Sequence, residues 1–207
     1  MNFQRKALWV SLAAAALLAG CGGGGADTTP VAPIRGIKVV GDSLADSGTF
    51  GYKFSVQGTA PTGTGATALW VDRVAASYSQ TLCARYASTD GVSFATKAGC
   101  TNYAVGGGRI NNFSNPQDPR SITLQLQQAA QVHGSYKSTD LLLVDGGGND
   151  AADLAGAYLG ATTVDGQAAY RALLTSLLPA ATVDALFGQV GGPEQAGGAY
   201  MQALADK

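Results

Sequence analysis

Three short apolar runs of this chain each end in a glycine-rich turn, and this repeated pattern constrains the fold more than any other feature. Residues 37–40 run into Gly41, residues 102–105 into three consecutive glycines, and residues 141–144 into Asp145 and three more glycines. Short apolar runs that alternate with longer helical patterns are typical of parallel strands in an α/β protein. Ligands bind at the carboxyl ends of such strands, so we expect the three turns to meet in one crevice.

Helical spacing of apolar residues predicts helices around this sheet. They cover residues 68–78, 122–132, 170–178 and 198–205, and turn-rich stretches around Pro179 and Pro193 separate the last two. We expect residues 122–132 to cover one face of the sheet and residues 141–144 to form a central strand buried on both faces. No internal repeat or second domain is recognisable, so residues 34–207 are predicted to form one domain.

The first residues of the chain have the composition of an export signal. Arg5 and Lys6 precede residues 7–20, an apolar stretch too short to span a bilayer comfortably. Its end, Leu-Ala-Gly before Cys21, resembles the lipobox of bacterial lipoproteins, which implies cleavage before Cys21 and lipidation of that cysteine. An ordinary secretory signal with a chance cysteine, or a short membrane anchor, are the alternatives. Gly22 is not the aspartate linked to inner-membrane retention, so the resemblance implies the outer membrane.

These features divide the chain into three parts. Residues 1–20 are the predicted lipoprotein signal peptide, and residues 21–33 are a flexible tether of glycine, threonine and proline. Residues 34–207 form the folded domain. We therefore expect an exported protein, lipid-anchored in the bacterial cell envelope through Cys21 or else secreted.

Charge and cysteine content exclude some functions. The net charge is −1 without a basic cluster, so a nucleic-acid partner is not expected. Cys83 and Cys100 form an even pair in an exported chain, which predicts a disulfide worth about 3 kcal/mol, with two free buried thiols as the alternative. One histidine and no second cysteine pair give little support for a metal site, and no cofactor is implied.

The three turns contain the groups that acyl transfer requires. Gly41 allows a tight turn and leaves space beside Ser43 for a substrate carbonyl. The backbone N–H of Ser43, a glycine N–H and the amide of Asn149 are candidate donors to the oxygen that becomes negative during the reaction. A nucleotide-phosphate cradle is the alternative for such glycine runs, but the Gly-x-Gly-x-x-Gly spacing and the P-loop lysine are both missing.

The turns also resemble the blocks of a known family. Residues 41–48, Gly-Asp-Ser-Leu-Ala-Asp-Ser-Gly, are similar to the first block of the GDSL family of SGNH hydrolases, which implies that Ser43 is the nucleophile. Residues 102–107 resemble the second block and align Gly107 with the oxyanion-hole glycine, Gly106 being a neighbouring possibility. Residues 147–150 resemble the third block, Gly-x-Asn-Asp, which makes Asn149 the side-chain oxyanion donor. Trp-Val-Asp at residues 70–72 is similar to an aromatic segment of larger members.

The resemblance implies a flavodoxin-like, three-layer α/β/α fold, but the family's last block, Asp-x-x-His, is missing. The single histidine, His133, precedes the third block at the predicted end of a helix, where its role is expected to be structural, through the last helix carbonyls. We therefore expect the chain to be the amino-terminal portion of a longer enzyme, with an incomplete sheet. Asp42 and Asp46 are interpreted as caps of a following helix, and Asp150 as ordering its own turn.

These interpretations lead to a serine esterase or lipase that forms an acyl-enzyme on Ser43, with an ester or lipid as substrate. Because a serine hydroxyl needs a base to become reactive, this chain is expected to be inactive alone. One alternative is a degenerate family member that acts as a catalytically inactive envelope binding lipoprotein. Another is a rearranged site in which His133 serves as the base.

Overall fold

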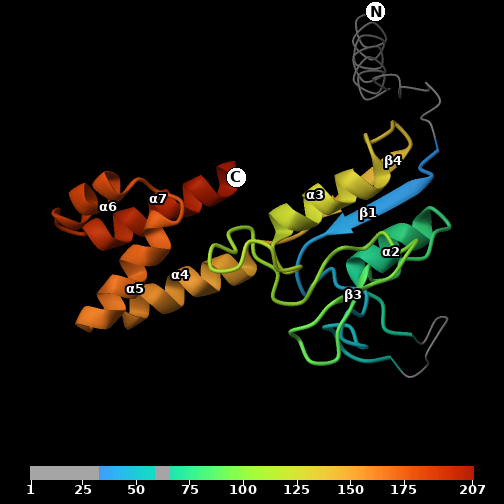
Figure 1. The fold of residues 1–207 in the computed structure, drawn as a ribbon, viewed down its shortest axis with the longest axis horizontal. Helices are drawn as coiled ribbons and strands as arrows, with labels where there is room; N and C mark the ends of the chain where they lie inside the picture. Colours follow the sequence, from blue (N-terminus) through green and yellow to red (C-terminus); the bar gives the residue numbers. More distant parts are fainter. Residues whose placement is uncertain (1–32, 59–65) are drawn as a thin grey trace, which may run out of the picture. The chain divides into compact units, whose positions relative to one another are not determined.

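The computed structural model describes residues 33–58 and 66–207, so the predicted signal peptide, most of the tether and the lipidation site at Cys21 lie outside the described residues. Its central feature is a parallel pair of strands, β1 (Gly36–Val40) and β4 (Asp140–Val144), drawn side by side in Figure 1. They pair from Gly36 opposite Asp140 to Val40 opposite Val144. Two of the three predicted strands are therefore confirmed.

The third predicted strand, at residues 102–105, lies beside β1 but forms no regular strand; Asn102 makes isolated parallel bridges with Val39 and with Ala84. The backbone N–H of Tyr103 donates to Val39, and that of Val105 donates to Gly41. The side-chain oxygen of Asn102 accepts the N–H of Ala104 at 2.9 Å. A side chain that bonds its own backbone in this way competes with a strand ladder, which explains why no regular strand forms here.

Residues 141–144 form the predicted strand, and its pairing differs from a central strand within the described residues. Within the part of the chain that the structure describes, β4 pairs only with β1 and lies at an edge of this two-stranded sheet. Its last residue, Val144, is 57% exposed, whereas Leu143 is buried. An apolar run shows that a strand has apolar neighbours, but it does not show on how many sides strands pair with it.

Helices cover both faces of the strands. On β1, Ile37 and Val39 pack with the buried residues of α2 (Trp70–Ser77), while Val40 packs with α3 (Ile122–His133). Alternate residues of a strand point to opposite faces, so α2 and α3 lie on opposite sides of the sheet. Both helices match predicted segments within a few residues. The described residues thus form an α/β domain.

The carboxyl-terminal part of the chain consists of helices. They are α4 (Gly148–Gly160), α5 (Val164–Thr175), α6 (Ala180–Phe187) and α7 (Gly192–Asp206), shown from orange to red in Figure 1. Their buried cluster includes Tyr170, Leu174 and Tyr200. Neither α4 nor α6 is among the predicted helices, because α4 contains three glycines and α6 begins directly after Pro179, where the sequence predicts a turn. No helix in the described ranges is long and apolar enough to cross a membrane.

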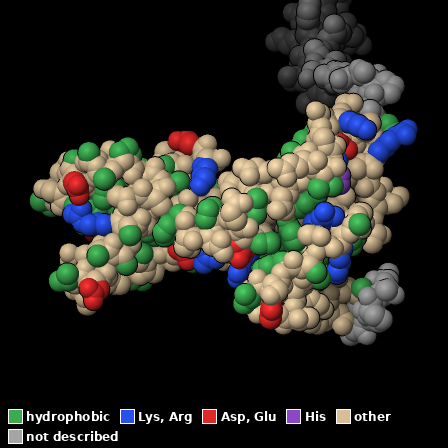
Figure 2. Space-filling view, in the orientation of Figure 1, with side chains coloured by type: hydrophobic (Ala, Val, Ile, Leu, Met, Phe, Trp, Pro, Cys, Tyr) green, Lys and Arg blue, Asp and Glu red, His purple; other side chains and the backbone are tan. Residues whose placement is uncertain are grey.

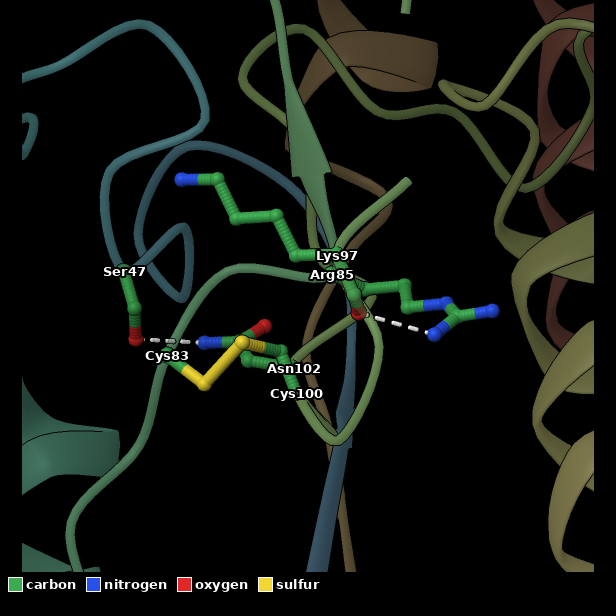
Figure 3. Close-up of a disulfide and its surroundings, with 6 residues drawn as sticks. All are labelled: Ser47, Cys83, Arg85, Lys97, Cys100 and Asn102. Carbon is green, nitrogen blue, oxygen red and sulfur yellow. Dashed lines mark hydrogen bonds between the residues drawn. A yellow bond between two sulfur atoms is a disulfide. The ribbon is translucent and has the colours of Figure 1, made fainter. Parts of the chain in front are cut away.

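The predicted disulfide between Cys83 and Cys100 is confirmed, with sulfur atoms 2.10 Å apart, and Figure 3 shows its surroundings. It lies beside a short antiparallel pair, β2 (Tyr86–Ala87) and β3 (Ala95–Thr96). The N–H of Asn102 donates to the carbonyl of Cys83, so the crosslink borders the extended segment that leads to the second glycine turn.

Candidate active site

The three glycine turns meet at the carboxyl ends of the strands, as expected. A Cβ atom on Gly41 would lie 2.7 Å from the carbonyl oxygen of Asp145, in the third turn. A Cβ atom on Gly108, in the second turn, would lie 2.6 Å from the carbonyl oxygen of Gly41. Glycine is required at both positions because the backbones approach too closely for any side chain.

Ser43 lies half-buried in the first turn, directly after Asp42. The Asp42 carboxylate is nearly buried and accepts the N–H of Leu44 at 3.0 Å. This hydrogen bond shapes the turn around Ser43. No α-helix begins after the turn, so the interpretation of Asp42 as a helix cap is wrong, although its role in the turn is structural.

Asp46 connects the first turn to the second. Its fully buried carboxylate accepts the N–H groups of Gly48 at 2.9 Å and Thr49 at 2.7 Å, and that of Gly106 at 2.9 Å. The helix-cap interpretation is wrong here as well, because the bonded N–H groups belong to loops. The N–H of Gly106 is therefore already bonded to Asp46, whereas the N–H of Gly107 meets no acceptor among the described residues.

Asn149 connects the third turn to the other two. It is the second residue of α4, and its Nδ2 donates to the carbonyl of Gly108 at 2.9 Å and to Asp42 Oδ2 at 3.4 Å. The side-chain amide of Asn149 therefore faces the turns that contain Ser43 and Gly107. The structure brings all three sequence-predicted elements together at one edge of the sheet.

Asp150 orders a neighbouring turn rather than its own, which corrects the sequence-based interpretation. Its buried carboxylate accepts the N–H of Ile110 at 3.0 Å and that of Asn111 at 2.8 Å. Asn111 in turn donates to the hydroxyls of Ser176 and Tyr200 in the helical region. The start of α4 is thus bonded to the loop that follows the second turn.

Arg109 is a further contact between these elements that sequence reasoning missed. Its guanidinium donates to the Gly107 carbonyl at 2.8 Å and forms a two-pronged ion pair with Asp153 of α4. The hydrogen bonds from Asp153 raise the pKa of Arg109, so the guanidinium stays charged. Gly107 and Asn149 are therefore connected through one ion pair and one helical turn.

Gln125 is the second site residue that the sequence analysis did not single out. From α3, its fully buried side chain accepts the N–H of Gly41 at 2.7 Å and donates to the Gly41 carbonyl at 3.1 Å. It also donates to the carbonyl of Pro119 at 2.8 Å. A glutamine on the buried face of a predicted helix was the available signal, because a buried amide needs partners.

Two ionisable residues lie near the strands: Asp145 belongs to the third turn, and His133 lies at the end of α3. Burial, with a smaller effect of the Asp42 charge, raises the pKa of Asp145, and its Oδ2 is buried without a partner among the described residues.

His133 ends α3 and contacts the hydroxyl of Tyr103 at 3.1 Å rather than the last helix carbonyls. It lies eight residues after Gln125, which is about 12 Å along the helix from the residue that binds Gly41.

The part of the chain that the structure describes contains no group of three histidine, cysteine, aspartate or glutamate side chains placed to hold a metal ion.

Comparison with known proteins identifies the family. The sequence model described as GDSL-like Lipase/Acylhydrolase matches residues 37–185, which include all three turns and most of the domain. Comparison with curated proteins and with solved structures gives no significant match. At the level of the family, the function is ester hydrolysis and the substrate is an ester or lipid. The chain belongs to the GDSL-like lipase/acylhydrolase family.

Proposed function

We propose that Ser43 is the nucleophile of a serine esterase or lipase, and that the N–H groups of Ser43 and Gly107 and the amide of Asn149 bind the oxyanion. The observation that carries this proposal is the state of the two backbone donors. Neither the N–H of Ser43 nor that of Gly107 has an acceptor within residues 33–58 and 66–207, although both belong to turns that touch one another. Donors that are held in place and left unpaired are what a developing oxyanion requires.

The reaction proceeds in two stages. The Ser43 oxygen attacks the ester carbonyl while its proton passes to a base. The bond between the carbonyl carbon and the alcohol oxygen then breaks, the base gives its proton to that oxygen, and the alcohol leaves behind an acyl-enzyme. Water attacks the acyl-enzyme, the acid is released, and Ser43 regains its proton. In both stages the carbonyl oxygen becomes negative and accepts hydrogen bonds from the three donors. Asn149 then exchanges its contacts with Gly108 and Asp42 for the oxyanion.

The base is not assigned to a residue of this chain. His133 is its single histidine, and it lies about 12 Å along α3 from the residue that holds the first turn. We therefore propose that residues 34–207 supply the nucleophile and the oxyanion donors, and that these residues alone have little activity. An oxyanion hole without the base retains a small part of the rate enhancement.

Substitution of Ser43 tests the proposal. In the natural protein, Ser43→Ala should lower kcat/KM for p-nitrophenyl acetate by about 10³-fold or more, and Asn149→Ala should lower kcat by about 10²-fold with little change in KM. Ser77→Ala, which removes an exposed hydroxyl bonded within α2, is the matched control and should leave both constants unchanged. Normal activity of Ser43→Ala would overturn the proposal.

A second candidate function is ligand binding without turnover. The contacts of Asn149 with Gly108 and Asp42 favour it, because the amide is satisfied in the absence of a substrate. This function predicts that an ester analogue binds equally well to the natural protein and to Ser43→Ala, and that neither releases product. Turnover that Ser43→Ala abolishes rules it out.

We also propose that the protein is exported and held in the cell envelope by lipid on Cys21, on the strength of the sequence pattern alone. Mass spectrometry of the amino-terminal peptide should show Cys21 as the first residue with attached acyl chains. Cys21→Ser should release the protein from the membrane fraction. An unmodified, uncleaved amino terminus would contradict this proposal.

A further inference from the structure

A single arginine connects the second turn to α4, beside the proposed oxyanion donors. Two nitrogens of the Arg109 guanidinium bind the carboxylate of Asp153, and the third donates to the carbonyl of Gly107 at 2.8 Å. On the face shown in Figure 2, acidic and basic side chains meet near the start of α4. The planar guanidinium has donors on three nitrogens, so one side chain holds a helix and a turn peptide in one geometry.

The main chain of Arg109 is itself anchored. Its N–H donates to the carbonyl of Arg120 at 2.8 Å, and its carbonyl accepts the N–H of Ile122 at 2.9 Å. Ile122 is the first residue of α3, so the main chain from which the arginine side chain extends is bonded to the start of that helix. The guanidinium therefore reaches Gly107 from a fixed position in the main chain.

Asp153 is placed to act together with Asn149. The two residues are four positions apart in α4, so their side chains lie on the same face of the helix. Asn149 donates directly to the carbonyl of Gly108 at 2.9 Å. Asp153 reaches the carbonyl of Gly107 through Arg109. One face of α4 thus holds two consecutive carbonyls of the second turn.

The proposed reaction affects these two attachments differently. In both of its stages, Asn149 leaves the carbonyl of Gly108 and binds the oxyanion. The contacts of Arg109 involve neither Asn149 nor the oxyanion, so they persist when that bond is broken. Asp150 also keeps its bonds, but they reach residues 110 and 111, beyond the turn. Among the described residues, the ion pair is then the contact of α4 that still reaches the turn peptides themselves.

We propose that Arg109 and Asp153 are positioning residues, whose ion pair holds the peptide of Gly107 in place relative to α4. They do this while Asn149 exchanges its bond to Gly108 for the oxyanion. The inference rests on the proposed function for the identity of the oxyanion donors, and it adds two residues that act through those donors. A donor held in place stabilises the oxyanion without reorganisation, so a loosened Gly107 lowers kcat more than it weakens substrate binding.

The first measurement is turnover of p-nitrophenyl acetate by the natural protein, with each kcat corrected for the folded fraction from urea unfolding. Arg109→Gln should lower kcat about tenfold and leave KM within about twofold. Arg109→Lys keeps the charge but has one nitrogen for two acceptors, so it should recover only part of kcat. Asp153→Asn should add nothing to Arg109→Gln, because both break the same contact. Arg171→Gln, the matched control, breaks an arginine–aspartate pair between α5 and α6 and should leave both constants unchanged.

The second measurement follows the Gly107 amide by NMR relaxation and needs no catalysis. Without substrate, either attachment alone should keep this amide rigid, so Arg109→Gln and Asn149→Ala should each leave its order parameter at about 0.85. The double variant lacks both attachments, so its order parameter should fall below about 0.6. Asn149→Ala combined with Arg171→Gln is the matched control and should stay rigid.

The two measurements separate this inference from the proposed function. The inference is overturned if the Gly107 amide stays rigid in the double variant, because another contact then holds the turn. It is also overturned if Arg109→Gln keeps its kcat in a protein whose turnover depends on Ser43. No Ser43-dependent turnover, together with a flexible amide in the double variant, contradicts the proposed function while the ion pair keeps its role in holding the turn.

Discussion

The strand-and-turn region, residues 34–145, and the helical region, residues 148–207, are stabilised by different interactions. Of the buried polar side chains in the described structure, ten lie in the strand-and-turn region and one, Asp150, lies in the helical region. The helices are held instead by a continuous apolar cluster around Leu174 and Tyr200. The strand-and-turn region also carries the disulfide.

The two regions use different interactions because the helices only need to be packed together, whereas the peptide groups of the turns must be held in a defined orientation. Apolar burial is non-directional, so it holds helices together without specifying the orientation of a peptide group. A glycine has no side chain to pack, so hydrogen bonds from neighbouring residues must fix its peptide group. Gln125 holds the peptide groups of Gly41, and Asp46 holds the N–H of Gly106. The buried polar side chains therefore gather around the turns whose peptide orientation determines the proposed site.

The largest effect is expected for Asp46→Ala. This change leaves three N–H groups without their acceptor, one of them on Gly106, in a buried environment. Hydrogen bonds to a charged group are the strong ones, so the free energy of unfolding should fall by about 3 to 5 kcal/mol in urea denaturation.

Asp90→Ala is the control for that change. Asp90 accepts the N–H groups of Val92 and Ser93 in the same way, but it is exposed, and those hydrogen bonds lower its pKa to about 2. Water replaces an exposed carboxylate, so stability should change far less than in Asp46→Ala. Equal losses in the two variants would show that burial of the acceptor does not matter.

The next effect lies in the helical region. Leu174→Ala removes a fully buried side chain from the apolar cluster and should lower the free energy of unfolding by about 3 kcal/mol. Leu159→Ala, at a position 72% exposed on α4, should have almost no effect. In Leu174→Ala, amide hydrogen exchange should become faster in α5 and α7, while the amide of Thr49 keeps the protection it has in the natural protein. Faster exchange at Thr49 with unchanged exchange in α5 and α7 would contradict the division into two regions.

A smaller effect is expected for Gln125→Leu, which keeps an apolar side chain of similar size at a buried position. The Gly41 N–H loses its acceptor, while the Gly41 carbonyl still accepts the N–H of Val105 at 3.2 Å. The unpaired Gly41 N–H, together with the partly buried Pro119 carbonyl that loses its donor, should cost about 2 kcal/mol. Gln127→Leu, at an exposed position of the same helix, should stay within about 0.5 kcal/mol of the natural protein.

Local patterns predicted much of the fold correctly. The apolar runs located β1 and β4, and helical spacing located α2 and α3, because burial determines those patterns directly. The helix α4 could not be located in this way, because its glycines and alanines show little periodicity, and which strand β4 pairs with could not be predicted either. Strand pairing depends on distant segments, which a local pattern does not contain.

The site shows the same limit. The glycine turns and their approach could be predicted, since parallel strands bring their carboxyl ends to one edge. The contacts that fix the turns could not. Asp150 binds Ile110 across the site, and Gln125 reaches Gly41 over 84 residues. The choice of acceptor depends on the tertiary fold, whereas a local sequence pattern contains only the nearest neighbours of each side chain.

The smallest effect concerns His133, a partly exposed group at the far end of the strand-and-turn region. Burial, followed by the positive charges of Lys38 and Arg85, lowers the pKa of His133 below 6.5. Below pH 6.5 the unfolded chain therefore binds this proton more readily than the folded one, so stability should decrease as the pH falls from 6.5 to the lowered pKa and then level off. NMR titration follows the single histidine directly, and Arg85→Gln should raise its pKa partway back. A midpoint at or above 6.5 in the natural protein would mean that the hydrogen bond to Tyr103 stabilises the charged ring. The polar contacts that stabilise the strand-and-turn region would then include the contact between Tyr103 and His133, in addition to those of the buried polar side chains around the turns.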